Sequence, residues 1–159
     1  MAATFQWSES NGAGPTVTDG ISNINFGSTD AVNLNTTTYP IIAAQNSYEK
    51  YNQGKFSGTF TTISNMKFWK SAGTYVTGED IKAAVTVTYT QPVATTSTVA
   101  TVTVPTSVGA ALTVLAIGGG ATITAPGYTE YIVMQLQTTG STPSGAVNQK
   151  TFTFQYDEV

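Results

Sequence analysis

Cysteine, histidine and arginine are all absent from this 159-residue chain. Without His or Cys, neither a Ser-His-Asp nor a Cys-His catalytic arrangement can be built, and the usual zinc ligands are missing as well. No disulfide can brace the fold, and thiol usage gives no information about the redox compartment. The length suits a single domain over residues 1–159 with a core large enough to be stable alone.

Charge of either sign is scarce. Asp, Glu, Lys and Arg make up 9% of the chain, whereas about 25% is usual. The six cations are all lysines, they are scattered, and the net charge is −3. Because a nucleic-acid-binding protein needs clustered positive charge to displace counterions from phosphates, we expect no nucleic-acid partner.

Long apolar segments are missing too. The best candidate, Val108–Gly118, is far shorter than the roughly 20 residues of a membrane-spanning helix, and it ends at Gly118–Gly120. It reads as a buried strand followed by a glycine turn, so we expect no membrane partner. Residues 1–7 show neither the basic segment nor the apolar core of a signal peptide, so we expect assembly in a cytoplasm.

What the chain does contain is apolar residues in alternation with Thr, Gln and Lys. Ile81, Ala83 and Val85 share one face of an expected strand, and Phe152–Tyr156 repeats the pattern with Thr and Gln between the aromatics. In Tyr128–Thr138 both faces are apolar, which is typical of a central or covered strand. Weaker strand predictions are Thr4–Ser8, Ser22–Phe26, Tyr39–Ala44, Lys55–Thr62, Asn65–Lys70, Val99–Val104, Leu112–Ile117 and Ala121–Thr124.

Turn signals separate these short segments, among them Asn11-Gly12, Thr77-Gly78 and Pro126-Gly127. No stretch shows a sustained helical period. Short strands with regular turns predict an all-β fold, and we expect an antiparallel two-sheet β-sandwich of jelly-roll or immunoglobulin-like type.

Carboxylate pairs of the glycosidase kind remain formally open, with Glu79, Asp80, Glu49 and Glu130 as candidates. Neighbouring Glu79 and Asp80 would point to opposite faces of an extended chain, and we expect both in the turn before the strand that starts near Ile81. They therefore make no pair by themselves. The sequence favours a non-enzymatic protein with no catalytic residue and no cofactor.

Calcium is a weaker alternative. Asp19, Asp30 and the nearby asparagines could offer oxygen ligands, but no segment matches an EF-hand loop. Asx-turns account for the same residues, so we expect no metal site.

Aromatic side chains are the remaining candidates for binding, and the set is Trp7, Trp69, Tyr75 and Tyr128. If Met66 and Phe68 face the core, Trp69 lies on the outer face of its strand beside Lys67. An outward Trp can anchor a partner protein or stack on a sugar, and it can also be covered by a loop or the other sheet. We take Trp7, Trp69, Lys67 and Tyr75 as candidate interface residues.

Three segments resemble virion structural proteins of bacteriophages: Asn65–Gly73, Tyr131–Gln137 and Lys150–Glu158. The resemblance covers about a third of the chain and includes no active-site motif, so no functional residue is carried over from it. Such proteins are β-sandwiches that decorate or brace heads or sit on tails.

The resemblance implies a capsid decoration or cement protein located in the virion, with the major capsid or other virion proteins as partners. A homo-oligomer and an N-terminal arm over residues 1–15 are further expectations of that role. Two alternatives stay open. One is a tail or fibre component that recognises a host surface, and the other is a carbohydrate-binding module with a glycan partner.

Overall fold

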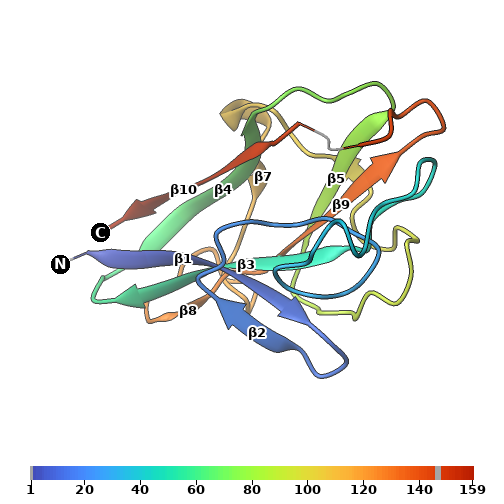
Figure 1. Cartoon of the computed structure of the whole chain (residues 1–159). Coiled ribbons are helices and arrows are strands. Elements are labelled where there is room, and N and C mark those ends of the chain that lie inside the picture. Colours follow the sequence, from blue (N-terminus) through green and yellow to red (C-terminus); the bar gives the residue numbers. More distant parts are fainter. Residues whose placement is uncertain (1, 146–147) are drawn as a thin grey trace.

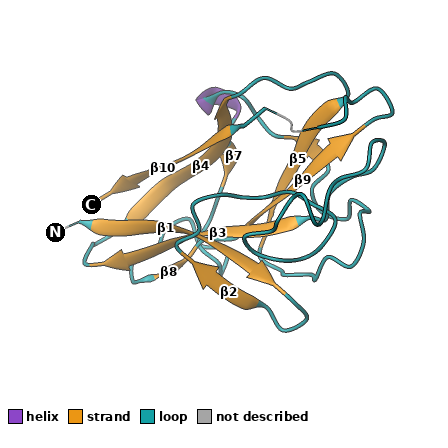
Figure 2. Ribbon diagram, viewed as in Figure 1, coloured by secondary structure: helices purple, strands orange, loops and turns teal. Residues whose placement is uncertain are grey.

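The computed structural model describes residues 2–145 and 148–159, and in them the chain forms two antiparallel β-sheets that pack together (Figures 1 and 2). The expected all-β, two-sheet sandwich is confirmed. The single helical element described is a 3-10 turn, η1, at Val108–Ala110. The strands are β1 (Ala3–Asn11), β2 (Thr16–Asp19), β3 (Lys50–Gly58), β4 (Ile63–Ala72), β5 (Glu79–Thr86), β6 (Val102–Thr103), β7 (Leu112–Thr113), β8 (Gly127–Tyr128), β9 (Tyr131–Thr138) and β10 (Thr151–Glu158).

The larger sheet has the strand order β2-β1-β3-β9-β5-β6, with β8 added to the end of β3. In the pairing of β1 with β3, Trp7 lies opposite Gly54. A side chain at Gly54 would collide with the Phe5 ring, so this position admits only glycine next to that aromatic. Gly54 on β3 therefore leaves space for the Phe5 ring of β1.

The smaller sheet contains three strands, in the order β10-β4-β7. Phe154 on β10 lies opposite Phe68 on β4. Two register irregularities interrupt this pairing, one between Thr151 and Phe152 and one between Gln155 and Asp157. Between them the strand runs regularly and its aromatics face the larger sheet.

The main core fills the space between the two sheets. Phe56, Met66, Phe68, Ile132 and Met134 are all essentially inaccessible there. The expected stripe of Phe152, Phe154 and Tyr156 packs against this core but stays partly exposed, because β10 is an edge strand.

Strand β9 is central, between β3 and β5, and both of its faces are covered as the sequence predicts. Ile132 and Met134 face the main core. Val133 faces the other way and forms a second cluster with Tyr51 and Ala100. The loop between β5 and β6 supplies Ala100 and so covers the outer face of the sheet.

Six expectations from the sequence are corrected. Val108–Gly118 is not one buried strand, because it contains η1 and the two-residue β7, and Ala121–Thr124 contains no named strand. The expected N-terminal arm over residues 1–15 is not seen in residues 2–15, because Ala3–Asn11 is β1 and pairs with both β2 and β3. The segments Ser22–Phe26 and Tyr39–Ala44 are irregular loop and not strand. Glu79 and Asp80 open β5 and do not belong to the preceding turn.

Candidate functional site

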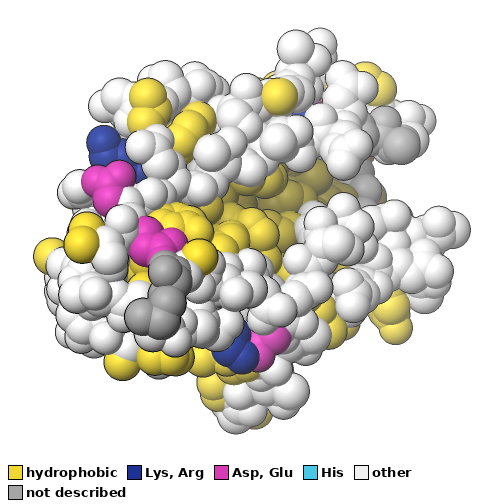
Figure 3. Space-filling view, turned by 90° about the vertical axis from the view of Figure 1, so that its left-hand side faces the viewer, with side chains coloured by type: hydrophobic (Ala, Val, Ile, Leu, Met, Phe, Trp, Pro, Cys, Tyr) yellow, Lys and Arg dark blue, Asp and Glu magenta, His cyan; other side chains and the backbone are white. Residues whose placement is uncertain are grey.

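The two sheets do not close over their whole length. Near the chain termini β10 lies against β1, where the Phe5 and Phe154 rings stack with centroids 5.0 Å apart. Away from the termini the sheets diverge (Figure 1), and a cleft of about 1220 Å³ opens between them. Figure 3 shows this hollow from the side, with hydrophobic side chains covering its interior.

The interior of the cleft is apolar and comes from distant parts of the sequence. Its side chains belong to β1, the loop between β2 and β3, β5, β9 and the start of β10, and they include Trp7, Ile24, Phe26, Ile41, Leu136 and Phe152. In a closed sandwich such side chains would pack against the opposite sheet. Here they border open space, which is unusual for a protein that works alone in water.

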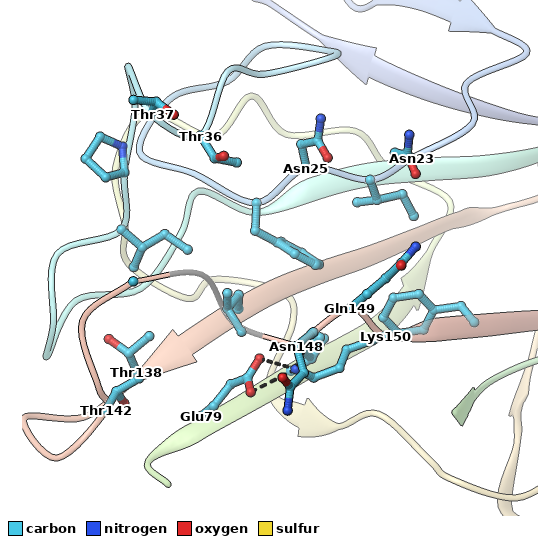
Figure 4. Close-up of a pocket in the computed structure, with 18 of the residues that line it drawn as sticks. Asn23, Asn25, Thr36, Thr37, Glu79, Thr138, Thr142, Asn148, Gln149 and Lys150 are labelled. Carbon is cyan, nitrogen blue, oxygen red and sulfur yellow. Dashed lines mark hydrogen bonds and ion pairs between the residues drawn. The ribbon is translucent and has the colours of Figure 1, made fainter. Parts of the chain in front are cut away.

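The rim of the cleft is polar and mostly uncharged. Amides and hydroxyls dominate it, among them Asn23, Asn25, Thr36, Thr37, Thr138 and Gln149. Figure 4 shows Asn23, Asn25, Thr36 and Thr37 on one side, and Thr138, Thr142, Glu79 and Asn148 on the other. An occupant would therefore meet neutral hydrogen-bonding groups before it reached the apolar interior.

One ion pair borders the cleft. Lys150 Nζ lies 2.7 Å from Glu79 Oε1, and both side chains are almost completely buried. Glu79 also accepts a hydrogen bond from the Val76 amide, at 2.9 Å. Because each charge already has its partner, this pair offers no free charge for an ionic ligand.

The candidate interface residues taken from the sequence do not form one surface. Trp7 faces inward, lines the cleft and contacts Phe68 and Phe154 edge-on. Trp69 is half-buried on the opposite face of the smaller sheet, since its neighbour Phe68 is in the core. Lys67 is half-buried on that same outer face, two residues before Trp69.

Tyr75 lies in the connection between β4 and β5 and is not part of the cleft lining. The Lys70 and Lys150 ammonium groups lie 4.8 Å and 5.5 Å from its ring centroid, as in cation–π contacts. Burial raises the pKa of Tyr75 to about 12, and the neighbouring Asp80 and Glu79 carboxylates act in the same direction. Tyr75 therefore contributes to the packing behind the Glu79–Lys150 pair.

The carboxylates considered for catalysis have structural partners. Glu49 accepts hydrogen bonds from the Thr98, Val99 and Ala100 amides at 2.7–2.9 Å, and so holds the loop between β5 and β6. Glu130 accepts one from the Leu115 amide at 3.2 Å. Asp80 pairs with Lys82 on the face opposite Glu79, as the alternation of a strand requires.

Asp19 and Asp30, considered as calcium ligands, are also held by the protein. Lys55 donates a hydrogen bond to Asp19, and this contact lowers the pKa of the Asp19 carboxyl. Asp30 accepts from Asn11 Nδ2 and from the Gly12 amide, at 2.8 Å and 2.9 Å. Over residues 2–145 and 148–159, no group of three or more acidic or other metal-binding side chains could hold an ion.

No helix within the described ranges is long and apolar enough to cross a membrane. No protein-family model, curated protein or solved structure matches this chain.

Of the cleft residues, the sequence singles out Trp7 as an interface candidate and Glu79 as a candidate carboxylate, but it does not indicate a shared cleft. Ile24, Phe26 and Ile41 lie in the segments Ser22–Phe26 and Tyr39–Ala44, for which the sequence predicts strands. The alternation of apolar and polar residues there was a real signal, but it reports only that one side of the chain is apolar. It does not say whether that side meets a second sheet or an open cleft.

Proposed function

We propose that this chain is a non-enzymatic structural protein that docks onto a larger protein assembly, most specifically as a decoration or cement protein on a bacteriophage head. The observation that carries this proposal is the open apolar cleft between the sheets. The apolar surface of this cleft is uncovered in the single chain. A partner that covered it would release water from that surface, which favours binding.

Three further features support a docking role. The cleft of about 1220 Å³ exceeds the roughly 300–1,000 Å³ of usual small-molecule pockets, so it suits a piece of protein better than a metabolite. The surface has few charges of either sign, so docking would depend on apolar and backbone contacts. The carboxylates of Glu49, Glu79 and Asp80 hold a loop or form ion pairs within the protein. The proposed function therefore assigns them no catalytic step.

The assignment to a virion rests on the resemblance of Asn65–Gly73, Tyr131–Gln137 and Lys150–Glu158 to phage structural proteins. Bound to the joints of a shell, many copies would resist outward pressure together, since each contact adds to the others by avidity. The partners are then the major capsid protein or other virion proteins, and the location is the virion.

A carbohydrate-binding module is the second candidate, favoured by one observation. Neutral amides and hydroxyls such as Asn23, Asn25 and Gln149 surround a cleft that contains the Trp7 and Phe152 rings. Aromatic rings and neutral hydrogen-bonding side chains are suited to sugars. Binding of an oligosaccharide that is lost in Trp7→Phe, while the fold is retained, would favour this candidate over docking.

The experiment that tests the decoration role uses purified particles made with and without this chain. Mass spectrometry should find the chain in the complete particles in many copies. Particles that lack it should form, but they should release their genome at a lower temperature, and adding the purified protein back should restore the parent temperature. A chain that is missing from the particles, or whose removal leaves their heat resistance unchanged, contradicts the decoration role.

A further inference from the structure

The edges of the two sheets differ greatly in length. The larger sheet ends in β2, of 4 residues, and in β6, of 2 residues. One edge of the smaller sheet is β7, also of 2 residues, whereas the other edge is β10, of 8 residues. Short edge strands protect a protein from pairing with other chains, so β10 is the exception that needs an explanation.

Within residues 2–145 and 148–159, no strand pairs with the outer edge of β10. Among the described residues β10 pairs only with β4, and the contact from Ala3 at its far end goes to the Glu158 side chain. Edge strands are usually protected by lysine, proline or a bulge, and Phe152–Gln155 contains none of these. The two irregularities of β10 lie on either side of this stretch, so it remains regular.

The same stretch borders the open cleft. Thr151 and Phe152 line it, and Phe152 and Phe154 remain only partly buried on their inward side. The loop segment Ile21–Phe26 lines the cleft on the side of the larger sheet, whereas Trp7 packs edge-on against Phe154 of β10 and Phe68 of β4. Because β10 is the last strand of the smaller sheet, no further strand of the described residues lies beside it.

From this geometry we infer that the cleft accepts an extended segment of a partner protein, which pairs with the free edge of β10 and inserts alternate apolar side chains between the sheets. The inference rests on the proposed docking function and names its mode, which is β-strand addition. Backbone hydrogen bonds to β10 would supply the directional part of the binding, and the cleft would select the side chains.

The lining defines the chemistry of the segment. Its inward residues should be apolar, because they would meet Phe26, Ile41 and Leu136. It should carry no charge at these positions, since the Glu79–Lys150 pair is already neutralised and burying another charge would be costly. Its outward residues should be small and polar, to match the Asn and Thr side chains of the rim.

The experiment is an NMR titration of the complete chain with a capped heptapeptide that has valine at every second position and threonine between. Two further peptides carry N-methyl groups on the amides of the odd or of the even residues, so that each one blocks one edge of the added strand. We expect amide shifts and slowed hydrogen exchange at Phe152–Gln155. One methylated peptide should lose binding and the other should keep it, because only one edge of the peptide faces β10.

A matched pair of variants tests the location. Ile42 lines the cleft and is 62% exposed, whereas Val93 is 75% exposed and lies outside the lining. Ile42→Lys should weaken peptide binding at least about tenfold, because a lysine charge there would have to be desolvated or pushed aside, and Val93→Lys should bind as the parent does. Both positions are exposed, so both variants should fold.

Several results would overturn strand addition, whatever happens in the particle experiment. These are the absence of shifts at β10, equal binding of the two methylated peptides, or parent-like binding by Ile42→Lys. A chain that is already dimeric, with Phe152–Gln155 protected before peptide is added, would show that a second copy occupies the edge. Conversely, peptide binding at β10 by a chain that is missing from virions would leave strand addition standing and remove only the decoration role.

Discussion

Lys150 Nζ lies within 2.9 Å of both carboxylate oxygens of Glu79, and the two side chains are 5% and 0% exposed. Lys150 immediately precedes β10, and Glu79 is the first residue of β5. The ion pair therefore ties the entry of the smaller sheet's edge strand to the larger sheet, beside the open cleft. It helps to fix how far apart the sheets stand at that place.

Breaking this pair on one side should be strongly destabilising. Lys150→Met leaves a buried carboxylate without its counter-ion, and we expect a loss of about 3–5 kcal/mol in the free energy of unfolding, measured with urea. The double variant Glu79→Leu/Lys150→Met buries no charge and should recover most of that loss. Equal stability of the parent and Lys150→Met would show that the pair does not hold the sheets together.

Glu49 should govern the loop between β5 and β6. Its carboxylate accepts hydrogen bonds from three backbone amides and from the Thr98 hydroxyl, the last at 2.6 Å. Glu49→Ala leaves these donors without an acceptor and should cost about 2–4 kcal/mol, whereas Glu49→Gln should cost less because one oxygen remains. Hydrogen exchange at Val99 and Ala100 should rise in Glu49→Ala. Unchanged protection there would mean that packing against Val133, and not the carboxylate, holds the loop.

The inward-facing aromatic side chains of β10 should contribute more to the stability of the fold than its outward-facing side chains. Phe154 contacts the rings of Phe5 and Trp7, with centroids 5.0 Å and 5.7 Å away. It is only partly buried, so we expect Phe154→Ala to cost about 2–3 kcal/mol, below the range for a fully buried Phe. Thr153→Ala should cost under about 1 kcal/mol. Thermal or urea unfolding measures both, and equal costs would show that the register of β10 is different.

The melting temperature should hardly change between pH 6 and pH 8, because the chain has no histidine to titrate there. At alkaline pH the ionisation of tyrosine side chains affects the stability of the fold. The pKa of Tyr75 is raised to about 12 in the fold, mainly by burial, from about 10 in the unfolded chain. The folded state holds this proton more tightly, so its contribution to stability is complete below pH 10 and is lost as the pH rises towards 12.

Tyr75→Phe isolates that contribution. Phenylalanine keeps the ring beside Lys70 and Lys150 but cannot ionise. The variant should lose less stability than the parent between pH 10 and 12, although burial also raises the pKa values of Tyr51 and Tyr89. A parent-like alkaline decline in Tyr75→Phe would mean that Tyr75 does not titrate with a raised pKa.

Much of the fold follows from the spacing of apolar residues. The position of Trp69 outside the core follows from Phe68 next to it, and the central place of β9 follows from apolar residues on both faces. These predictions depend only on the two-residue period of a strand, which is a local property of the backbone. The prediction of strands at Ser22–Phe26 and Tyr39–Ala44 failed because alternation does not guarantee a partner strand to pair with.

The cleft lay beyond sequence reasoning for a different reason. Its lining joins Trp7, Ile24, Leu136 and Phe152, which only the strand order brings together. Strand order is set by long-range pairing, and a periodic pattern carries no connectivity. The free edge of β10 is likewise a property of the sheet and not of the strand's own residues.

The most direct test of docking through apolar and backbone contacts is the salt dependence of binding to particles that lack the chain. Affinity should be nearly equal at about 50 mM and about 500 mM sodium chloride, because no screened charge pairs hold the interface, and it should not fall in sulfate. Ile42→Lys should weaken binding at least about tenfold at both concentrations, while Trp69→Ala on the outer face, like Val93→Lys, should bind normally. An affinity that collapses as salt rises, together with normal binding by Ile42→Lys, would contradict the account.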